Sequence, residues 1–588
     1  MNRTHNNGEL RLSHVGQTVT LLGWVAKKRN LGSLIFIDLR DRYGVTQVIF
    51  DESFDEQLRE VKNEYILQVT GQVVERSSKN PKMLTGDIEI QATAFEIVNT
   101  AKLTPMIIAD ETDALEEKRM QYRYLDLRRP VMQQNIMTRH KITRCIREYL
   151  DNLDFVDIET PYLNRSTPEG ARDFLVPSRV HKGEFYALPQ SPQLFKQLLM
   201  VAGFERYYQI ARCFRDEDLR ADRQIEFTQV DVEMSFLPTE KILEIGEGMV
   251  AKIMHDIKGI DLQLPLRRIT WHESMERYGI DKPDTRFGLE LVNLNEVVKD
   301  VDFAVFKSAL EANGHVKGIN VTGQAQAFSR KKIDHLTEIA KTYKAKGLAW
   351  LKVTAEGVQG PIAKFFTEEQ LQRLLEAMDA HDNDLLIFVS DVKYAIVCDA
   401  LAAIRNYLGK ELKLYDPHTF DFLWVVDFPM FEYDDETQRY YAMHHPFTRP
   451  KTEDIDKLES DPEHCLADAY DIVLNGFELG GGSQRIYEQS LQERAFKALG
   501  FTQEQIDAQF GWFVEAFQYG TPPHGGFALG LDRIAMLLCE CDSLRDVIAF
   551  PKNTSATCPM SKAPTPVADA QLKELGIEVS KHESKESE

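Results

Sequence analysis

The stretch "FRDEDLRADRQIEFTQVDVEMSF", residues 214–236, holds three arginines and seven acidic residues, and from Glu226 onward it alternates strictly. The alternation predicts a β-strand. One face of that strand is polar apart from a single aromatic ring, and it carries Phe227, Gln229, Asp231 and Glu233. The preceding "RYYQIARCFR" at 206–215 also alternates, so we expect a hairpin joined by the charged stretch. The polar face is either solvated or built for a charged ligand, and the clustered charge favours the ligand.

Composition indicates an ordinary multidomain globular protein. The chain has 588 residues, of which 43% are hydrophobic and 28% charged, and this length predicts three or four domains. The start "MNRTHNNGEL" has no signal-peptide pattern, and the apolar run "GGFALGLDRIAMLL" is interrupted by charge, so we expect no membrane span. Seven cysteines without zinc-like spacing favour free thiols and a cytoplasmic location.

The formal net charge of −22 argues against a nucleic-acid partner without excluding one. Local basic strips exist at 27–30 ("KKRN") and 118–129 ("KRMQYRYLDLRR"). Five β-like runs between residues 18 and 100 predict a small OB-type barrel, a fold whose open face commonly binds single-stranded nucleic acid. Phe36 and Gln47 are candidates for stacking on bases and hydrogen-bonding to them; the alternative for Phe36 is a ring in the barrel core.

The rest of the chain divides into further segments that differ in composition and in the helices and strands they predict. We expect the barrel within 1–103, a polar hinge at 104–130, a catalytic domain in two parts at 131–282 and 423–564, an inserted α+β domain at 283–422, and a C-terminal extension at 565–588 whose end reads as disordered. Within the first catalytic part, a helix with a stripe of apolar residues runs into a short strand ending at Pro161.

A second pair of strands predicts a metal site. In "YDIVLNGFELGGGSQRI" the dipeptide Asn475-Gly476 signals a two-residue hairpin that sets Val473 opposite Glu478. Asp471 then lies on the same face as Glu478, and two carboxylates suit Mg²⁺ better than zinc. The alternative is an edge pair of solvated acids, and the following glycines, 480–482, would allow a ligand to approach the backbone closely.

Three segments together resemble the signature motifs of class II aminoacyl-tRNA synthetases. These are the helix and strand ending at Pro161, the "FRDE" loop leading to Phe227, and "GLDR" at 530–533. The whole chain, from barrel to insertion, resembles the bacterial type of aspartyl-tRNA synthetase. The resemblance implies an α+β multidomain fold with an N-terminal OB-fold barrel, an antiparallel-sheet catalytic domain and an inserted α+β domain. It also implies ATP-dependent activation of aspartate with Mg²⁺, and transfer of the aspartyl group to tRNA(Asp).

The resemblance also implies roles for individual residues. Arg215, Glu217 and Arg533 are expected to be catalytic, with Arg215 on the α-phosphate and Phe227 stacked under adenine. The ATP site is expected to comprise Arg215, Asp216, Glu217, Gln224, Phe227, Glu478, Gly530, Leu531, Asp532 and Arg533, with Asp471 and Glu478 as metal ligands. The aspartate site is expected to comprise Glu169, Gln193, Lys196, Arg215, Gln229, Asp231, His444 and Arg485. His445 is as well placed by sequence as His444, and the two cations Lys196 and Arg485 predict an acidic substrate side chain.

In the barrel, the resemblance implies an anticodon site made by Arg29, Leu31, Phe36 and Gln47. Leu31 resembles enzymes restricted to tRNA(Asp), so we expect discriminating charging; relaxed charging of tRNA(Asn) is the alternative. The helix before Pro161 implies a homodimer, although an internal core helix would show the same stripe. A catalytically silent tRNA-binding relative is a further alternative, against which the presence of Arg215, Glu478 and Arg533 argues.

Overall fold

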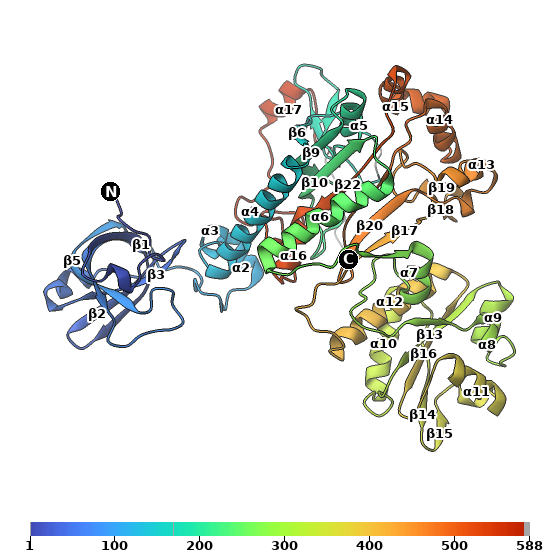
Figure 1. The fold of residues 1–588 in the computed structure, drawn as a ribbon, viewed down its shortest axis with the longest axis horizontal. Helices are drawn as coiled ribbons and strands as arrows, with labels where there is room; N and C mark the ends of the chain where they lie inside the picture. Colours follow the sequence, from blue (N-terminus) through green and yellow to red (C-terminus); the bar gives the residue numbers. More distant parts are fainter. Residues whose placement is uncertain (1, 168–169, 581–588) are drawn as a thin grey trace. The chain divides into compact units, whose positions relative to one another are not determined.

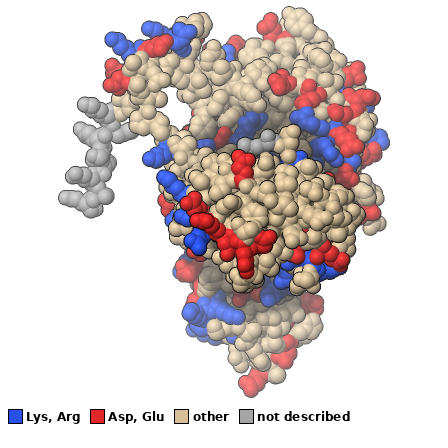
Figure 2. All heavy atoms as spheres, turned by 90° about the vertical axis from the view of Figure 1, so that its left-hand side faces the viewer, with Lys and Arg blue, Asp and Glu red and all other residues tan. Residues whose placement is uncertain are grey.

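The computed structural model describes residues 2–167 and 170–580, and it divides into two compact units. The first unit comprises the described parts of 1–141, 218–225 and 535–588, and the second comprises those of 142–217 and 226–534. Among the described residues, no helix is long and apolar enough to cross a membrane. Acidic and basic side chains are interspersed over the face drawn in Figure 2.

The first unit contains the predicted five-stranded barrel (Figure 1). Its strands close in the order β1-β2-β3-β5-β4, and they are β1 (Thr18–Leu31), β2 (Leu34–Asp41), β3 (Gly44–Phe50), β4 (Ile66–Glu75) and β5 (Ile88–Asn99), with the short helix α1 (Asp55–Leu58) between β3 and β4. Alternate residues such as Leu21, Val25, Ile37 and Leu39 are fully buried in the barrel core. The even spacing of apolar residues therefore positions the intervening side chains on the outer face.

The segment predicted as a polar hinge contains two helices, α2 (Glu116–Gln121) and α3 (Arg123–Asp126). Asp126 is completely buried and accepts hydrogen bonds from Arg119 (3.0 Å), Arg123 (2.6 Å) and Arg129 (2.9 Å). Burial raises the pKa of Asp126, but the three arginines outweigh burial and hold that pKa below its ordinary value. The basic strip at 118–129 thus organises local structure around the buried Asp126.

The second unit is built on an eight-stranded sheet, antiparallel except at its two ends. Its order is β11-β17-β20-β21-β22-β10-β9-β6. The strands are β6 (Val156–Asp157), β9 (Arg206–Phe214), β10 (Glu226–Ser235), β11 (Arg267–Thr270), β17 (Phe422–Val426), β20 (Ala469–Leu474), β21 (Phe477–Gln484) and β22 (His524–Gly530). The strand predicted to end at Pro161 is limited to β6, which pairs with the edge of β9.

Helices and two small hairpins surround this sheet. The helices are α5 (Gln193–Val201), α6 (Thr239–Lys258), α7 (Trp271–Tyr278), α13 (Lys457–Ser460), α14 (Gln489–Ala498) and α15 (Gln503–Ala516), and the hairpins are β7 (Leu175–Pro177) with β8 (Phe185–Ala187) and β18 (Phe431–Asp434) with β19 (Arg439–Ala442). Two helices span both units along the chain, namely α4 (Pro130–Asp151) and α16 (Leu531–Leu538). In α4 the predicted stripe is buried, with Ile142, Ile146 and Leu150 fully covered.

The inserted segment has a sheet of its own with helices on both faces (Figure 1). The sheet runs β12-β13-β16-β14-β15, with β12 (Leu291–Asn293), β13 (His315–Val321), β14 (Ala349–Thr354), β15 (Gly357–Gln359) and β16 (Leu385–Asp391). One core packs α10 (Arg330–Thr342) and α12 (Tyr394–Glu411) against it, and another packs α8 (Asn295–Val298), α9 (Ala304–Glu311) and α11 (Glu368–Ala377). The C-terminal extension forms α17 (Asp569–Leu575); the expected disorder concerns an end, 581–588, that lies outside the described residues.

Candidate active site

The alternating strand of the opening stretch is β10, in the interior of the eight-stranded sheet. β10 pairs with β9, which sets Phe227 opposite Cys213 and Asp231 opposite Gln209. It also pairs with β22, where Gly530 lies opposite Gln229. Both faces of β10 are covered, because Asp231 and Glu233 are 0% exposed, as are Val230, Val232 and Met234 on the opposite face. The polar face is therefore a buried site.

Two buried cations neutralise these two acids. Lys196 on α5 donates a hydrogen bond to Asp231 (2.7 Å) and lies 3.4 Å from Glu233. Arg485 donates hydrogen bonds to both carboxylate oxygens of Glu233, at 2.9 and 3.1 Å. Both cations are therefore paired within the protein, as buried charges must be to be stable. The ammonium group of Lys196 has three N–H donors, and one of them is not used by these contacts. The Nη2 atom of Arg485 has two N–H donors, and one of them is likewise not used. A substrate carboxylate can accept both.

Electrostatics differ between the two acids. Burial raises the pKa of Glu233, but the charges of Arg485 and Lys196 outweigh it and hold that pKa below its ordinary value. For Asp231 burial outweighs Lys196 and the pKa is raised. The Oδ2 atom of Asp231 accepts no hydrogen bond from the described residues, and Nε2 of Gln193 on α5 is likewise buried without a partner among them. These two atoms offer an acceptor and a donor to a polar ligand.

The two adjacent histidines face different groups. Nε2 of His445 lies 2.8 Å from Nη1 of Arg485, and its Nδ1 accepts a hydrogen bond from the Phe447 N–H. Burial, reinforced by the charge of Arg485, lowers the pKa of His445 well below its ordinary value, so the ring is neutral. His444 lies with Nε2 3.5 Å from Asp471; burial lowers the pKa of His444, but that carboxylate outweighs it and raises the pKa overall. His445 thus adjoins the cation pair and His444 the carboxylate pair.

The predicted hairpin with Asn475 and Gly476 is confirmed. Both turn residues have positive φ, 53° and 86°, and Val473 lies opposite Glu478. Burial raises the pKa of Asp471 to about 6, and the charge of Glu478 adds to it while His444 opposes it. Gly481 stands opposite Asp471, and a Cβ there would lie 1.8 Å from the Asp471 carboxylate. The glycine therefore makes room for the acid.

Sequence reasoning missed Lys282, whose Nζ lies 3.6 Å from Glu478 and 3.3 Å from Asp281. Burial lowers the pKa of Lys282, but Asp281, Glu478 and Asp471 outweigh burial and raise it. No local pattern marks this lysine, which is far from the hairpin in sequence. Among the described residues no group of three or more His, Cys, Asp or Glu side chains could hold a metal by itself.

Several residues predicted for the nucleotide site lie near one another in the second unit. The guanidinium of Arg215 lies 5.1 Å from the centre of the Phe227 ring, and Arg533 donates a hydrogen bond to the Glu478 carbonyl, which brings the third motif to the hairpin. The carboxylate of Asp532 accepts the Thr228 N–H at 2.7 Å, so it anchors β10 to the start of α16, which follows Gly530 directly at Leu531.

Other predicted residues are held elsewhere or lie outside the description. The backbone N–H of Asp216 donates to the Arg172 carbonyl, and Glu217 follows it, half-buried. Gln224 belongs to the first unit, where its amide exchanges two hydrogen bonds with the backbone of Lys552. Gln229 accepts a weak contact from Cys213 at 3.4 Å. Glu169 lies outside the described residues.

On the barrel, the four predicted residues lie on or beside one polar network. Arg29 donates to Asp38 (2.6 Å) and to Gln47 (3.0 Å), and the Gln47 amide donates to Glu89 (2.7 Å). Phe36 is paired with Arg29 in register and half-buried, between the core residues of its strand, so the core alternative for its ring is wrong. Leu31 is 64% exposed at the end of β1.

Comparisons with known proteins agree with this architecture. Residues 115–554 match the family tRNA synthetases class II (D, K and N), and residues 19–98 match the OB-fold nucleic acid binding domain. The chain is 58% identical over 589 residues to an Aspartate--tRNA(Asp/Asn) ligase of Bacillus cereus (strain AH187), covering 99% of this chain and 100% of the relative. A protein of the same name from Bacillus cytotoxicus is 58% identical over 583 residues, covering 98% and 99% of the two chains.

Solved structures show the same fold at low sequence identity. An asparaginyl-tRNA synthetase from Entamoeba histolytica in complex with asparaginyl-adenylate superposes with a TM-score of 0.59 at 18% identity, covering 93% of this chain and 98% of the other. A putative aspartyl-tRNA synthetase from Leishmania major Friedlin gives a TM-score of 0.58 at 19% identity, covering 94% of both chains. With an OB-fold barrel, an antiparallel sheet carrying the three motifs in order, and full-length relatives, the chain belongs to the class II tRNA synthetases of the D, K and N group.

Proposed function

We propose that this protein is an aspartate–tRNA ligase that activates L-aspartate with ATP, releases pyrophosphate, and transfers the aspartyl group to the 3′-terminal adenosine of tRNA(Asp). The observation that carries the proposal is the buried set formed by Lys196, Arg485, Asp231 and Glu233. Each cation keeps one donor for a substrate carboxylate, and the full-length relatives are named for aspartate. A lysine-specific site would instead need unpaired acids at these positions.

The chemistry of activation needs positioning more than proton transfer. The α-carboxylate of aspartate is already ionised and attacks the α-phosphorus directly, so no side-chain base is required. Arg215 is suited to the α-phosphate because its guanidinium can hold two oxygens, and Phe227 offers its ring to adenine beside it. Arg533, tied to the Glu478 carbonyl, is placed to neutralise the phosphates of ATP. We assign supporting roles in nucleotide binding to Asp216, Glu217, Gly530 and Leu531.

The other proposed residues complete the substrate sites. Gln193 has an amide donor without a partner among the described residues, and with Asp231 and Gln229 it is suited to polar groups of aspartate. We retain Glu169 for the α-ammonium group and His444 for the side of the site near Asp471. We place His445 rather than His444 beside the substrate carboxylate, because His445 contacts Arg485.

Asp471 and Glu478 fit a magnesium site completed by ATP. Two carboxylates on one face, with Gly481 giving the space for Asp471, match the hard oxygen ligands that Mg²⁺ prefers together with substrate phosphates. When bound, Mg²⁺ would neutralise phosphate charge on the departing pyrophosphate. Lys282 beside Glu478 holds a positive charge at the same place.

We propose that the barrel reads the anticodon through Arg29, Leu31, Phe36 and Gln47. Leu31 offers no hydrogen bond to a wrong third base, which favours charging of tRNA(Asp) alone. The second candidate is a ligase that also charges tRNA(Asn), and the names of the relatives favour it. Aminoacylation of the two purified tRNAs with aspartate separates the candidates: comparable kcat/KM for both would establish the relaxed enzyme.

We further propose that the protein works as a homodimer in the cytoplasm. The edge strand β6 and the segment after it expose Val156, Tyr162 and Leu163, an apolar patch at a sheet edge that suits self-complementary contact. All seven cysteines are free, which suits a reducing compartment.

The function is tested by aspartate-dependent exchange of pyrophosphate into ATP with purified protein and Mg²⁺. Exchange with aspartate, and far less with asparagine or lysine, is the expected result. Absence of exchange with all three amino acids would favour a silent tRNA-binding relative instead.

A further inference from the structure

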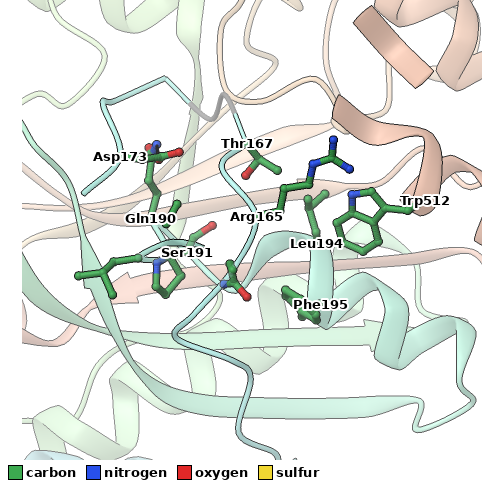
Figure 3. Close-up of a pocket in the computed structure, with 12 residues that line it drawn as sticks. Arg165, Thr167, Asp173, Gln190, Ser191, Leu194, Phe195 and Trp512 are labelled. Carbon is green, nitrogen blue, oxygen red and sulfur yellow. Dashed lines mark hydrogen bonds between the residues drawn. The ribbon is translucent and has the colours of Figure 1, made fainter. Parts of the chain in front are cut away.

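Lys282 is held more loosely than other cations of the second unit. Lys196 donates to Asp231 at 2.7 Å, and Arg165, which lines a cavity of about 380 Å³ beside α5 (Figure 3), donates to the Ala508 carbonyl. The ammonium group of Lys282 lies 3.3 and 3.6 Å from the two carboxylates beside it, beyond the roughly 2.7–2.9 Å of a charge-assisted hydrogen bond. Its side chain is 39% exposed, whereas that of Lys196 is 2% exposed. Lys282 therefore has donors available for a ligand.

Glu478 places Lys282 next to the third sequence motif. The Glu478 carboxylate lies beside Lys282, and the Glu478 backbone carbonyl accepts a hydrogen bond from Arg533. Two cations thus contact one residue of the β20–β21 hairpin. Phosphates that approach Asp471 and Glu478 are repelled by both carboxylates unless positive charge lies beside them. Lys282 is placed to supply such a charge.

The backbone just before Lys282 is fixed against the inserted segment. Gly279 caps the end of α7 with a φ of 69°, and a Cβ on this glycine would lie 2.6 Å from the Cys398 carbonyl of α12. The Ser274 hydroxyl of α7 donates to the Ile280 carbonyl at 2.6 Å. The chain therefore leaves α7 in one direction, toward the hairpin.

The backbone just after Lys282 is fixed against the hairpin turn. A Cβ on Gly476 would lie 3.2 Å from the Cβ of Asp284, and Arg286 holds both oxygens of Asp284 at 2.9 and 2.7 Å. The start of the Lys282 side chain is thus fixed from both directions, while its ammonium end is loosely bound. A flexible four-carbon stem on such a backbone lets the ammonium group change partner without movement of the fold.

We propose that Lys282 is a further ATP ligand, an assignment that rests on the proposed function. Its ammonium group turns from Asp281 and Glu478 to the pyrophosphate part of ATP and neutralises it until it departs. Arg215 keeps its assignment to the α-phosphate. Because AMP has only that phosphate, Lys282 contributes to the binding of ATP and not to the binding of AMP.

The test compares equilibrium binding of α,β-methylene ATP, which cannot be cleaved to AMP, with binding of AMP, each in the presence of Mg²⁺. Lys282→Met removes the ammonium group, and Lys282→Arg keeps the charge. The matched control is Lys252→Met on α6. Lys252 also lies beside two carboxylates, 2.9 Å from Asp256 and 3.6 Å from Glu148, and its side chain is 27% exposed.

We expect Lys282→Met to bind α,β-methylene ATP about tenfold more weakly and to bind AMP as wild type does. Lys282→Arg should recover most of the affinity for the ATP analogue, and Lys252→Met should bind both nucleotides normally. Thermal unfolding checks that each variant is folded. Unchanged binding of the ATP analogue by Lys282→Met overturns the proposal, and so does an equal loss of binding for the two nucleotides, which would indicate a purely structural lysine.

Pyrophosphate exchange with aspartate, measured on the wild type, reports on the proposed function separately. Absence of exchange together with Lys282-dependent binding of the ATP analogue would contradict the proposed function and keep Lys282 as a phosphate ligand. Normal exchange in wild type together with normal binding in Lys282→Met would contradict only the role of Lys282.

Discussion

At the scale of single residues, Lys196 combines a structural role with a proposed role in substrate binding. Other buried lysines of the chain have only a structural role, so substitutions can distinguish the two. It binds Asp231 and Glu233 and, by our proposal, the substrate side chain. Lys196→Leu leaves the buried Asp231 without its cation, while Glu233 keeps Arg485. The unpaired charge costs about 3–5 kcal/mol, so aspartate-dependent exchange should fall a hundredfold or more while ATP binding survives.

The matched control is Lys317→Leu, because Lys317 on β13 of the inserted segment is equally buried and pairs with Glu276 on α7. It should lower the melting temperature similarly and keep the KM for aspartate. If kcat/KM for aspartate fell less than about tenfold in Lys196→Leu, the lysine would have to be withdrawn from the substrate site.

A second residue-scale prediction concerns His445 and pH. Burial and Arg485 lower its pKa in the folded protein, whereas the unfolded chain takes up the proton near its ordinary value of about 6.5. Below that value the unfolded state binds more protons, so this histidine's contribution to stability is complete above about pH 6.5 and is lost as the pH falls, at up to about 1.4 kcal/mol per unit.

His445→Gln, which keeps a polar group beside Arg485 but has no titratable ring, should therefore lose less stability than wild type between about pH 7.5 and 5.5. Urea midpoints at the two pH values measure this difference. His335→Asn on the exposed side of α10 serves as the control and should behave as wild type does. An equal loss of stability in wild type and His445→Gln would show that the ring is protonated in the native state.

At the scale of elements, the β20–β21 hairpin contains two glycines with different roles. Gly480 is needed for the packing of the sheet, and Gly481 gives space to Asp471 in the proposed metal site. A Cβ on Gly481 would meet the Asp471 side chain at 1.8 Å, but a Cβ on Gly480 would meet the Ala528 backbone carbonyl of β22 at 1.9 Å. Gly481→Ala should keep the fold and displace the carboxylate, lowering exchange about tenfold to a hundredfold. Gly480→Ala should lower the melting temperature instead, and Gly347→Ala, with open space around it, should do neither. Normal exchange in Gly481→Ala would remove Asp471 from the metal site.

The same elements show which features could be predicted from sequence. The Asn475-Gly476 turn, the barrel strands and the alternation of β10 depend on neighbours in the chain, and local chemistry specifies them. The bond from Arg485 to Glu233 joins residues 252 positions apart, so no window could reveal that the cations are already paired. Sequence analysis missed Lys282 for the same reason, because Glu478 and Asp471 lie far from it in the sequence. Sequence analysis did not predict the short helices α2 and α3, because isolated helices of that length are unstable. Their stability comes from the arginines around Asp126.

The sheet edge at β6 carries the prediction of a dimer. Leu163→Glu places a charge in an apolar patch that we propose is covered by a second copy, so the mass in solution should fall toward the 67.5 kDa of one chain. Val180→Glu, at an apolar residue that is 73% exposed elsewhere in the second unit, should leave the mass of wild type unchanged. A wild-type mass of one chain at micromolar concentration would instead make the stripe on α4 purely an internal core.

At the scale of the whole molecule, our proposal divides the reaction between the two compact units. Aspartate and ATP are assigned to the sheet of the second unit, and the anticodon is assigned to the barrel of the first. Activation requires no tRNA, so changes on the barrel should affect aminoacylation alone. Exchange and aminoacylation measured on the same variant therefore report on the two units separately.

Phe36→Ala is the sharpest probe of this division, because the ring is half-buried on the outer face of β2 and outside the barrel core. Stacking of one base on an aromatic ring is worth about 1–3 kcal/mol, so kcat/KM for tRNA(Asp) should fall about fivefold to a hundredfold, while pyrophosphate exchange stays at the wild-type rate. Tyr43→Ala removes another exposed barrel aromatic, at the β2–β3 turn, and should alter neither reaction. A drop in exchange would mean that the barrel supports the catalytic sheet. An unchanged kcat/KM for tRNA would move the anticodon site away from Phe36 and from the network of Arg29 and Gln47 beside it.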